Sequence, residues 1–555
     1  MKLRARPIAL FLLAFLIVVP GLWVWWYHVR AKRAVGDYKR QLIAAGEKLT
    51  VEELIPTPVP PGRNSADVFL KAVGLLSVRQ SLLDTNAPAA MRMVSRGKAM
   101  IGWAQPDIPD FYEGKLTNSW TEAEAAIEQI AEGLELLRTI VERPNLDFAP
   151  DYHDGFTAPL PNLAQRKQAA QRLLAAALCD SHRGDGDAAS LNLRGMLALV
   201  RGLTEERLVI SQMVRNAIAA ISVGVSWELL RSPAVSDEQL AAMHRDWAEL
   251  QFYPAMENAL AMERAKGETT LAQMRDSSAV FSNYVSGFSW GRAGAASSTD
   301  GWLDEAEEIA KASWSKTKLK SKETVWRIAW SYPDQLRTLK GYQVVLEAFR
   351  AVRTNRGFIV AASEQTRRLE ELGVLDGDLA GDFGTDPVDW DFRVLMSQSL
   401  SLMARMLNRV TTIETARQIT ITAIALRRHQ LRHGVHPPAL SALVPEFIPA
   451  VPRDPVDGQP LRYRLNNDGT FLLYSVGEDG VDNGGDPIPA NTNATSLAWQ
   501  RGRDWVWPQP ASANEVADYF ESLRKKNPRY AMRYGLSDTN RTAPLTNNAA
   551  TNAGK

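Results

Sequence analysis

Residues 163–203 read LAQRKQAAQRLLAAALCDSHRGDGDAASLNLRGMLALVRGL, and this stretch decides the fold. Two Ala- and Leu-rich runs, Leu163–His182 and Ala188–Leu203, flank the segment RGDGD at 183–187. Ala and Leu are strong helix formers, whereas Gly and Asp favour turns. The stretch therefore predicts two helices joined by a short turn, which is the basic unit of a helical body.

Helical spacing continues on both sides of this pair. Apolar residues three and four positions apart predict further helices at 31–51, 64–83, 119–142, 205–230, 236–266, 302–314, 321–339 and 392–432. Thr121 and Glu124 have the spacing of a capping box at the start of the 119–142 helix. No segment recurs at a fixed period, so the pattern predicts a mainly α fold without establishing a solenoid.

Composition limits the classes of partner. The chain has 555 residues with 64 basic and 63 acidic side chains, a net charge of +1, so no overall field attracts nucleic acid. One cysteine, Cys179, excludes an intrachain disulfide framework and a Cys-rich zinc site. We therefore expect no nucleic-acid partner.

The N-terminus predicts a membrane anchor. Residues 1–6 are basic, and residues 7–29 contain no Asp, Glu, Lys or Arg. About 23 helical residues span roughly 30 Å of hydrocarbon. Trp23, Trp25 and Trp26 suit the headgroup layer. The rival interpretation is a cleaved signal peptide, which needs small residues where this chain has Trp, Tyr and His. We predict an uncleaved transmembrane helix that contacts lipid through residues 7–29.

Changes in composition predict the domain order. We expect a basic N-terminus (1–6), the transmembrane helix (7–29), a stalk with a Pro-rich spacer (30–62), a helical domain (63–276), a flexible loop (277–301), a helical region (302–412), an α+β module (413–510), a short helix (511–536) and a disordered tail (537–555). Basic residues balance on the two sides of residues 7–29, so flanking charge does not set the orientation.

The module at 413–510 combines a helix with β-prone runs. The segment NNDG at 466–469 separates the runs Leu461–Leu465 and Thr470–Val476, which predicts a β-hairpin. Before the hairpin, the helix ends near Gly434 and Pro437. A leucine turn at Leu440–Leu443, a Pro-bounded segment at Val444–Pro452 and a D-P-x-x-x-x-P-x-x-Y block from Asp454 to Tyr463 follow in that order.

These pieces, followed by Y-S-x-G-x-D-G at Tyr474–Gly480, resemble the globular domain of the major pseudopilin of type II secretion systems. The resemblance covers residues 413–486. It does not extend to the N-terminus, because residues 7–29 contain no Glu and no leader cleavage junction precedes them. Prepilin processing and pilus assembly through that helix are therefore not expected.

The resemblance implies a calcium-binding loop after the last strand of the hairpin. Calcium takes six to eight oxygen ligands, and Asp479, Asp482 and Asp486 supply carboxylates within one Gly-rich loop. The alternative is a solvated acidic turn. Together with the anchor, the resemblance also implies a single-pass protein of the bacterial inner membrane with its bulk in the periplasm.

A second candidate site is Ser289 in Gly287-Phe288-Ser289-Trp290-Gly291, which matches G-x-S-x-G. A hydrolase nucleophile in this motif needs a strand before it and a helix after it. The surrounding sequence lacks alternating strands and helices, which favours an aromatic loop. We therefore expect a non-enzymatic envelope scaffold or interaction protein with a protein partner. The alternatives are a membrane-tethered hydrolase that uses Ser289 and a component of a type II secretion system.

Overall fold

The protein is mainly helical, with small sheets, in a computed structural model that describes residues 5–76, 83, 87–109, 117–153, 162–289, 320–374, 395–477, 479–490 and 496–526. Its α-helices are α1 (Ala5–Ala44), α2 (Val51–Leu54), α3 (Ala66–Leu76), α5 (Trp120–Glu128), α6 (Ala131–Thr139), α7 (Leu163–His182), α8 (Gly186–Gly202), α9 (Val209–Leu229), α10 (Asp237–Ala248), α11 (Phe252–Asp276), α12 (Ser278–Ser289), α14 (Ser331–Ala351), α15 (Phe358–Glu371), α16 (Leu400–His433) and α17 (Ala513–Lys526). Short 3-10 turns occupy Pro61–Arg63, Ile140–Glu142, Ser397–Ser399, Leu440–Leu443 and Trp499–Arg501, and π-turns occupy Trp326–Trp330 and Val352–Arg356.

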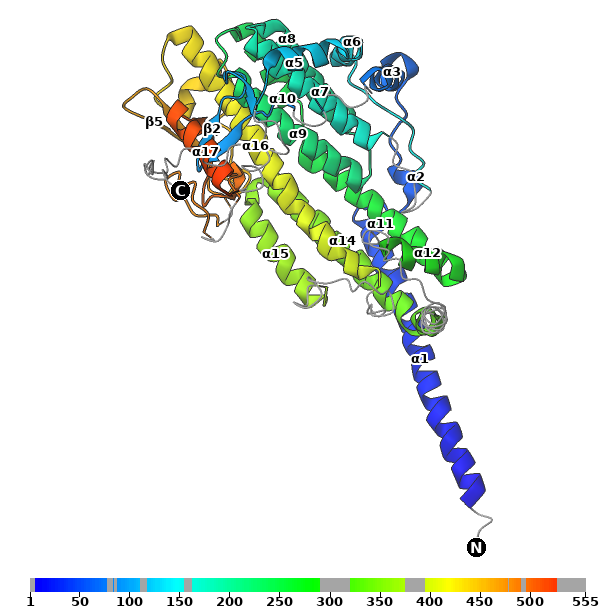
Figure 1. Cartoon of the computed structure of the whole chain (residues 1–555). Helices are drawn as coiled ribbons and strands as arrows, with labels where there is room; N and C mark the ends of the chain where they lie inside the picture. The colour runs from blue at the N-terminus through cyan, green and yellow to red at the C-terminus, as the bar shows by residue number, and fades with distance from the viewer. Residues whose placement is uncertain are drawn as a thin grey trace, which may run out of the picture.

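Helix α1 leaves the body as a single rod (Figure 1). Pro20 lies inside it without ending it. The C-terminal part of α1 packs on α14: Val35 and Leu42 of α1, and Leu49 after its end, bury their side chains with Leu339. The side chains of residues 5–17 lie outside the described part of the structure, so the transmembrane prediction for residues 7–29 stays a prediction.

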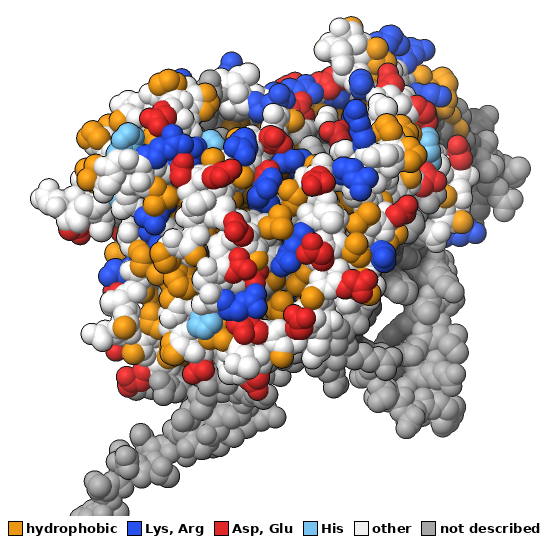
Figure 2. All heavy atoms as spheres, turned by 90° about the horizontal axis from the view of Figure 1, so that it is seen from above, with side chains coloured by type: hydrophobic (Ala, Val, Ile, Leu, Met, Phe, Trp, Pro, Cys, Tyr) orange, Lys and Arg blue, Asp and Glu red, His pale blue; other side chains and the backbone are white. Residues whose placement is uncertain are grey.

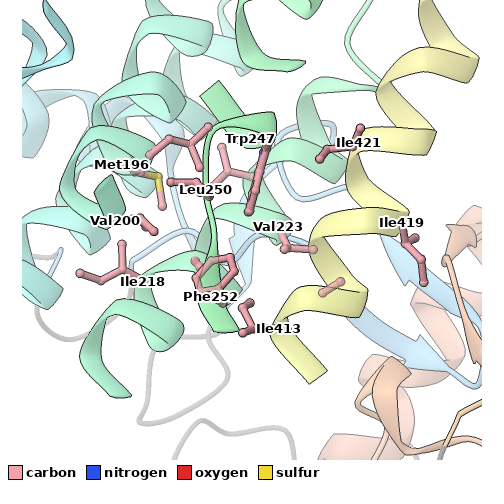
Figure 3. Close-up of a cluster of buried hydrophobic side chains, with 14 of the residues drawn as sticks. Met196, Val200, Ile218, Val223, Trp247, Leu250, Phe252, Ile413, Ile419 and Ile421 are labelled. Atoms are coloured by element: carbon pink, nitrogen blue, oxygen red, sulfur yellow. The ribbon is translucent and has the colours of Figure 1, made fainter. Parts of the chain in front are cut away.

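The predicted pair at 163–203 forms α7 and α8, which pack on α9 at the centre of the body. Figure 3 shows how α16 closes this core: Ile413 and Ile421 lie on the side of α16 that faces Val223 and Trp247, while Phe252 lies at the start of α11. The same apolar cluster runs from Phe69 to Trp507. The helical body and the C-terminal module therefore share one core, and α16 runs from the predicted helical region (302–412) into the module (413–510).

Three small sheets complete the fold. The hairpin prediction is confirmed: β5 (Arg462–Leu465) pairs antiparallel with β6 (Phe471–Ser475), and β6 pairs with β7 (Trp505–Val506). A second sheet joins β1 (Arg92–Ser95), β2 (Lys98–Met100) and β8 (Gln509–Pro510), with β2 and β8 parallel. The third pairs β3 (Ile108–Pro109) with β4 (Thr117–Asn118). Strands β1–β4 lie inside the predicted helical domain at 63–276, where no strand was predicted.

Several sequence predictions differ from the structure. The helix predicted at 236–266 is two helices, α10 and α11, separated at residues 249–251. Residues 278–289 form α12 instead of part of a flexible loop, because Phe281, Tyr284 and Val285 make an apolar stripe that packs on Trp326. The predicted 119–142 helix is split into α5 and α6 at Ile130, and its capping box is Ser119 with Glu122. Residues 290–301 of that loop and the predicted tail at 537–555 lie outside the described residues.

Within the described residues, α9 is long and apolar enough to cross a membrane by length and composition. It packs between α7, α8 and α16, and 61% of its most apolar window is buried. We therefore treat α9 as a core helix.

Candidate functional site

A cleft of about 300 Å³ lies where the helical body meets the C-terminal module. Four segments line it: the end of the α10–α11 connection with the start of α11, the π-turn at 352–356 with Gly357, the middle of α16, and the loop at 453–458. Ligand sites are commonly concave and placed between structural units. The lining residues are Gln251, Phe252, Tyr253, Pro254, Val352, Arg353, Gly357, Glu414, Arg417, Gln418, Arg453, Asp454, Pro455 and Gly458.

The seam beside the cleft is held by backbone contacts. The N–H groups of Phe358 and Ile359, at the start of α15, donate to the carbonyl oxygens of Pro455 (2.9 Å) and Val456 (3.1 Å). These are donors that a helix start cannot satisfy internally. Gly357 has a φ of +73°, and a Cβ there would lie 2.7 Å from the carbonyl carbon of Asp457. A glycine is therefore required for the π-turn to meet the loop.

Charged groups of the cleft fall into a buried and an exposed set. Glu414 and Arg417 form a buried ion pair at 2.5 Å, and Arg417 also donates to the Trp247 carbonyl at 3.2 Å. Arg353 pairs with Glu257 at 2.8 Å, and Arg453 donates to the Gly458 carbonyl at 2.9 Å. Since Arg353 and Arg453 are both exposed, the rim of the cleft presents two guanidinium groups to solvent.

Asp454 makes its hydrogen bonds within the C-terminal module. Its buried carboxylate accepts hydrogen bonds from Ser475 (2.9 Å) and from the N–H groups of Val456 (2.9 Å) and Val476 (3.0 Å). Burial raises the pKa of Asp454, against the lowering effect of these hydrogen bonds. Asp454 therefore ties the loop at 453–458 to β6.

The polar side chains of the cleft are guanidinium, carboxylate and amide groups and the Tyr253 hydroxyl. Among the described residues that line it there is no Ser, Thr, Cys, His or Lys to act as a nucleophile or as a histidine base. The Tyr253 hydroxyl donates to Thr411 at 2.9 Å, and burial raises the pKa of Tyr253 above its ordinary value. Arginine is suited to bidentate recognition of carboxylates, so the rim suits a ligand that carries such groups.

The three aspartates predicted to bind calcium lie in one loop, but local donors engage each carboxylate. Asp479 accepts from the Val481 N–H at 3.0 Å, and Asp482 accepts from the Tyr474 hydroxyl at 2.9 Å. Asp486 pairs with Arg503 at 3.1 Å. Within the described part of the chain, no group of three or more His, Cys, Asp or Glu side chains gathers as a metal site. Calcium binding stays a prediction.

Sequence reasoning missed the residue that organises this loop. The carboxylate of Asp504, just before β7, accepts the N–H groups of Asn483 (3.1 Å), Gly485 (2.7 Å) and Asp486 (3.0 Å). Burial raises the pKa of Asp504, against these three hydrogen bonds. Asp504 lies outside the acidic loop in the sequence, so no local motif linked it to residues 483–486.

Ser289 is the last residue of α12, and its side chain lies outside the described part of the structure. The residues before it form a helix, whereas the G-x-S-x-G nucleophile follows a strand. The geometry therefore gives the hydrolase alternative no support.

Comparisons with known proteins add no relative: no protein-family model, no curated protein and no solved structure matches the chain. In Figure 2, the upper face of the body interleaves Lys and Arg with Asp and Glu, so this face shows no broad patch of one sign.

Proposed function

We propose that this protein is a membrane-anchored scaffold of the bacterial envelope that binds a protein partner through the cleft between body and module. The observation that carries the proposal is the cleft, whose rim presents Arg353 and Arg453 and whose lining offers no histidine or hydroxyl nucleophile other than the hydrogen-bonded Tyr253. The partner then presents Asp, Glu or a C-terminal carboxylate to the two arginines.

The anchor part of the proposal draws on α1. Trp23, Trp25 and Trp26 are 61%, 64% and 50% exposed, although large aromatic side chains are costly to leave in water. A lipid bilayer around the rod of α1 (Figure 1) is the environment that suits such side chains. Together with the resemblance of residues 413–486, the anchor favours a location of the bulk of the chain on the periplasmic side of the inner membrane.

Site-specific photo-crosslinking in native membranes tests the proposal. A photoreactive residue at Gln251, an exposed position in the cleft lining, is expected to trap a discrete protein adduct, and Arg353→Glu in the same chain is expected to abolish it. The matched control is the same photoreactive residue at Val360, an exposed position on α15. Equal adducts at both positions, or an adduct that survives Arg353→Glu, would contradict binding through the cleft.

Association with secretion machinery is a second candidate. It draws on the resemblance of residues 413–486 and on the order of α16, the turn at 440–443 and the β5–β6 hairpin, which is the order that the resemblance implies. Co-purification with a secretin or an assembly ATPase would support it. A full-length protein that purifies without either from crosslinked membranes would count against it.

A further inference from the structure

A second segment of the chain lies beside α1 where that helix leaves the body. The His28 ring nitrogen Nδ1 is 2.7 Å from the Ile328 carbonyl oxygen. The rings of Tyr27 and Trp330 are 6.1 Å apart in an edge arrangement, and those of His28 and Tyr332 are 4.8 Å apart. The π-turn at 326–330 and the first residues of α14 are thereby fixed against residues 27–28 of α1.

The π-turn at 326–330 and the residue before it carry both buried and exposed apolar side chains. Trp326 is fully buried and packs with Phe281 and Met396, which fixes this turn to the body. Val325 and Ile328 are 55% and 53% exposed, although both are large and apolar. Turns of π geometry are rare and are frequent at functional sites. The body therefore directs two apolar side chains outward next to the anchor.

A groove of about 540 Å³ lies between this turn and α1. It is lined by Gly21, Val24, Trp25, His28, Arg327 and Ile328. The absence of a side chain at Gly21 widens it, since a Cβ there would have no neighbour within 4 Å. The lining is largely apolar, which suits a hydrocarbon chain.

The position of the groove along the membrane normal follows from helix geometry. Residues 21–28 fall in the last third of the uncharged stretch 7–29, and they rise about 10 Å along the helix axis. If residues 7–29 cross a bilayer of roughly 30 Å of hydrocarbon, the groove lies in the leaflet nearest the body. Because the Ile328 carbonyl and the Trp330 ring contact residues 27–28, the backbone of the π-turn lies at the boundary between hydrocarbon and headgroups, and the Ile328 side chain lines the groove on the hydrocarbon side.

Basic residues near the body end of the uncharged stretch also fit a membrane surface. Arg30, Lys32 and Arg33 follow the uncharged stretch, and Lys320 is exposed in the helical turn before Val325. Basic residues next to a membrane segment are attracted to anionic headgroups. Arg30, Lys32 and Arg33 therefore lie where lipid phosphates would be, whereas Ile328 lines the groove beside residues 21–28 of α1.

We propose that Val325 and Ile328, together with the groove against α1, form a second lipid-contacting surface, in which an acyl chain of a bilayer phospholipid fills the groove. This inference rests on the proposed anchor. It implies that the body sits directly on the membrane, with the start of α14 in the headgroup layer.

Spin labels on the full-length protein in liposomes of phosphatidylethanolamine and phosphatidylglycerol test this. Single cysteines replace Trp25 in the anchor, Val325 and Ile328 in the proposed surface, and Val360 as the control in water. All four side chains are exposed, so labelling there should not prevent folding. Cys179 can stay, because it is buried and burial raises the pKa of its thiol to about 12.

Labels at 325 and 328 are expected to match the label at 25: frequent collision with oxygen and loss of collision with a water-soluble nickel complex. The label at 360 should show the reverse. If 25 behaves as lipid-exposed while 325 and 328 behave like 360, the second surface is wrong and the anchor stands. If 25 also behaves like 360, the anchor fails and this inference fails with it.

Discussion

Glu47 joins the anchor helix to the body. It follows α1 in the turn before α2, and its carboxylate accepts hydrogen bonds from Arg264 of α11 (2.9 Å), Gln343 of α14 (3.1 Å) and Arg350 of α14. The Arg264 side chain is 1% exposed. Burial raises the pKa of Glu47, but the three hydrogen bonds outweigh it and lower the pKa to about 2.

Replacing Glu47 by Ala is expected to lower the free energy of unfolding by about 3–5 kcal/mol, since it leaves the buried Arg264 cation without its carboxylate. Glu52→Ala is the matched control. Glu52 lies at the start of α2 with its side chain 69% exposed, so its loss should cost at most about 1 kcal/mol. Denaturant unfolding of the purified protein measures both, and equal losses would contradict the role given to Glu47.

The same carboxylate predicts acid sensitivity. The folded pKa of Glu47 lies below its ordinary value of 4.5, so its contribution to stability is complete above pH 4.5 and is lost as the pH falls through 2. Thermal unfolding between those two pH values should therefore show a steeper loss in the wild-type protein than in Glu47→Gln. Parallel curves would count against the prediction.

Glu228 predicts the opposite pH dependence. It is fully buried in α9 and accepts N–H hydrogen bonds from Met91 (2.7 Å) and Gly102 (3.0 Å). Burial raises its pKa to about 8, against these hydrogen bonds. Since the folded pKa exceeds the ordinary 4.5, its stability contribution is complete below pH 4.5 and is lost as the pH rises through 8.

Glu228→Gln should remove this dependence between about pH 5 and pH 8, whereas Glu135→Gln, at an exposed site on α6, should keep it. Melting temperatures across that pH range give the measurement. A wild-type slope that survives in Glu228→Gln would assign the dependence to another group.

At the scale of elements, strong local signals predicted the structure well. The run at 163–182 became α7 with the predicted bounds, because the breaker segment at 183–187 leaves no ambiguity about its end. The NNDG turn likewise fixed the β5–β6 register, with Leu465 opposite Phe471. Strands β1 and β2 were missed because three or four residues are too few to show alternation, and β2 pairs with β8 far along the chain.

The acidic loop at 479–486 can be stabilised by the Asp504 carboxylate, by a calcium ion, or by both, and the two contributions can be measured separately. Asp504→Ala leaves three loop N–H groups without their acceptor, at about 1–3 kcal/mol for each one that stays buried. The melting temperature of the Asp504→Ala variant in calcium-free buffer should therefore be lower than that of the wild-type protein. Asp457→Ala is the control, since the Asp457 carboxylate contacts Arg462 and Gln459 and not the loop at 479–486.

Calcium titration of the full chain tests the metal prediction in the same assay. Binding to the native state would raise the melting temperature with calcium concentration. The rise should disappear in Asp479→Ala/Asp482→Ala. An equal rise in that double variant would assign the ion to another site, and no rise in the wild type would remove the prediction.

At the scale of the whole molecule, the cleft was beyond sequence reasoning. Its lining comes from residues near 252, 353, 417 and 455, which the fold brings together only after α11, α14 and α16 have packed. No spacing rule links Arg353 to Arg453. The mainly helical class could be predicted, because every long apolar stripe contributes to it independently.

The central claim is that residues 7–29 hold the protein in a bilayer while the helical body lies outside it. The most direct measurement is alkaline carbonate extraction of membranes, followed by intact-mass determination of the protein. We predict that the protein stays in the membrane pellet with residues 1–29 retained. Recovery from the soluble fraction of a chain that has lost those residues would contradict the account.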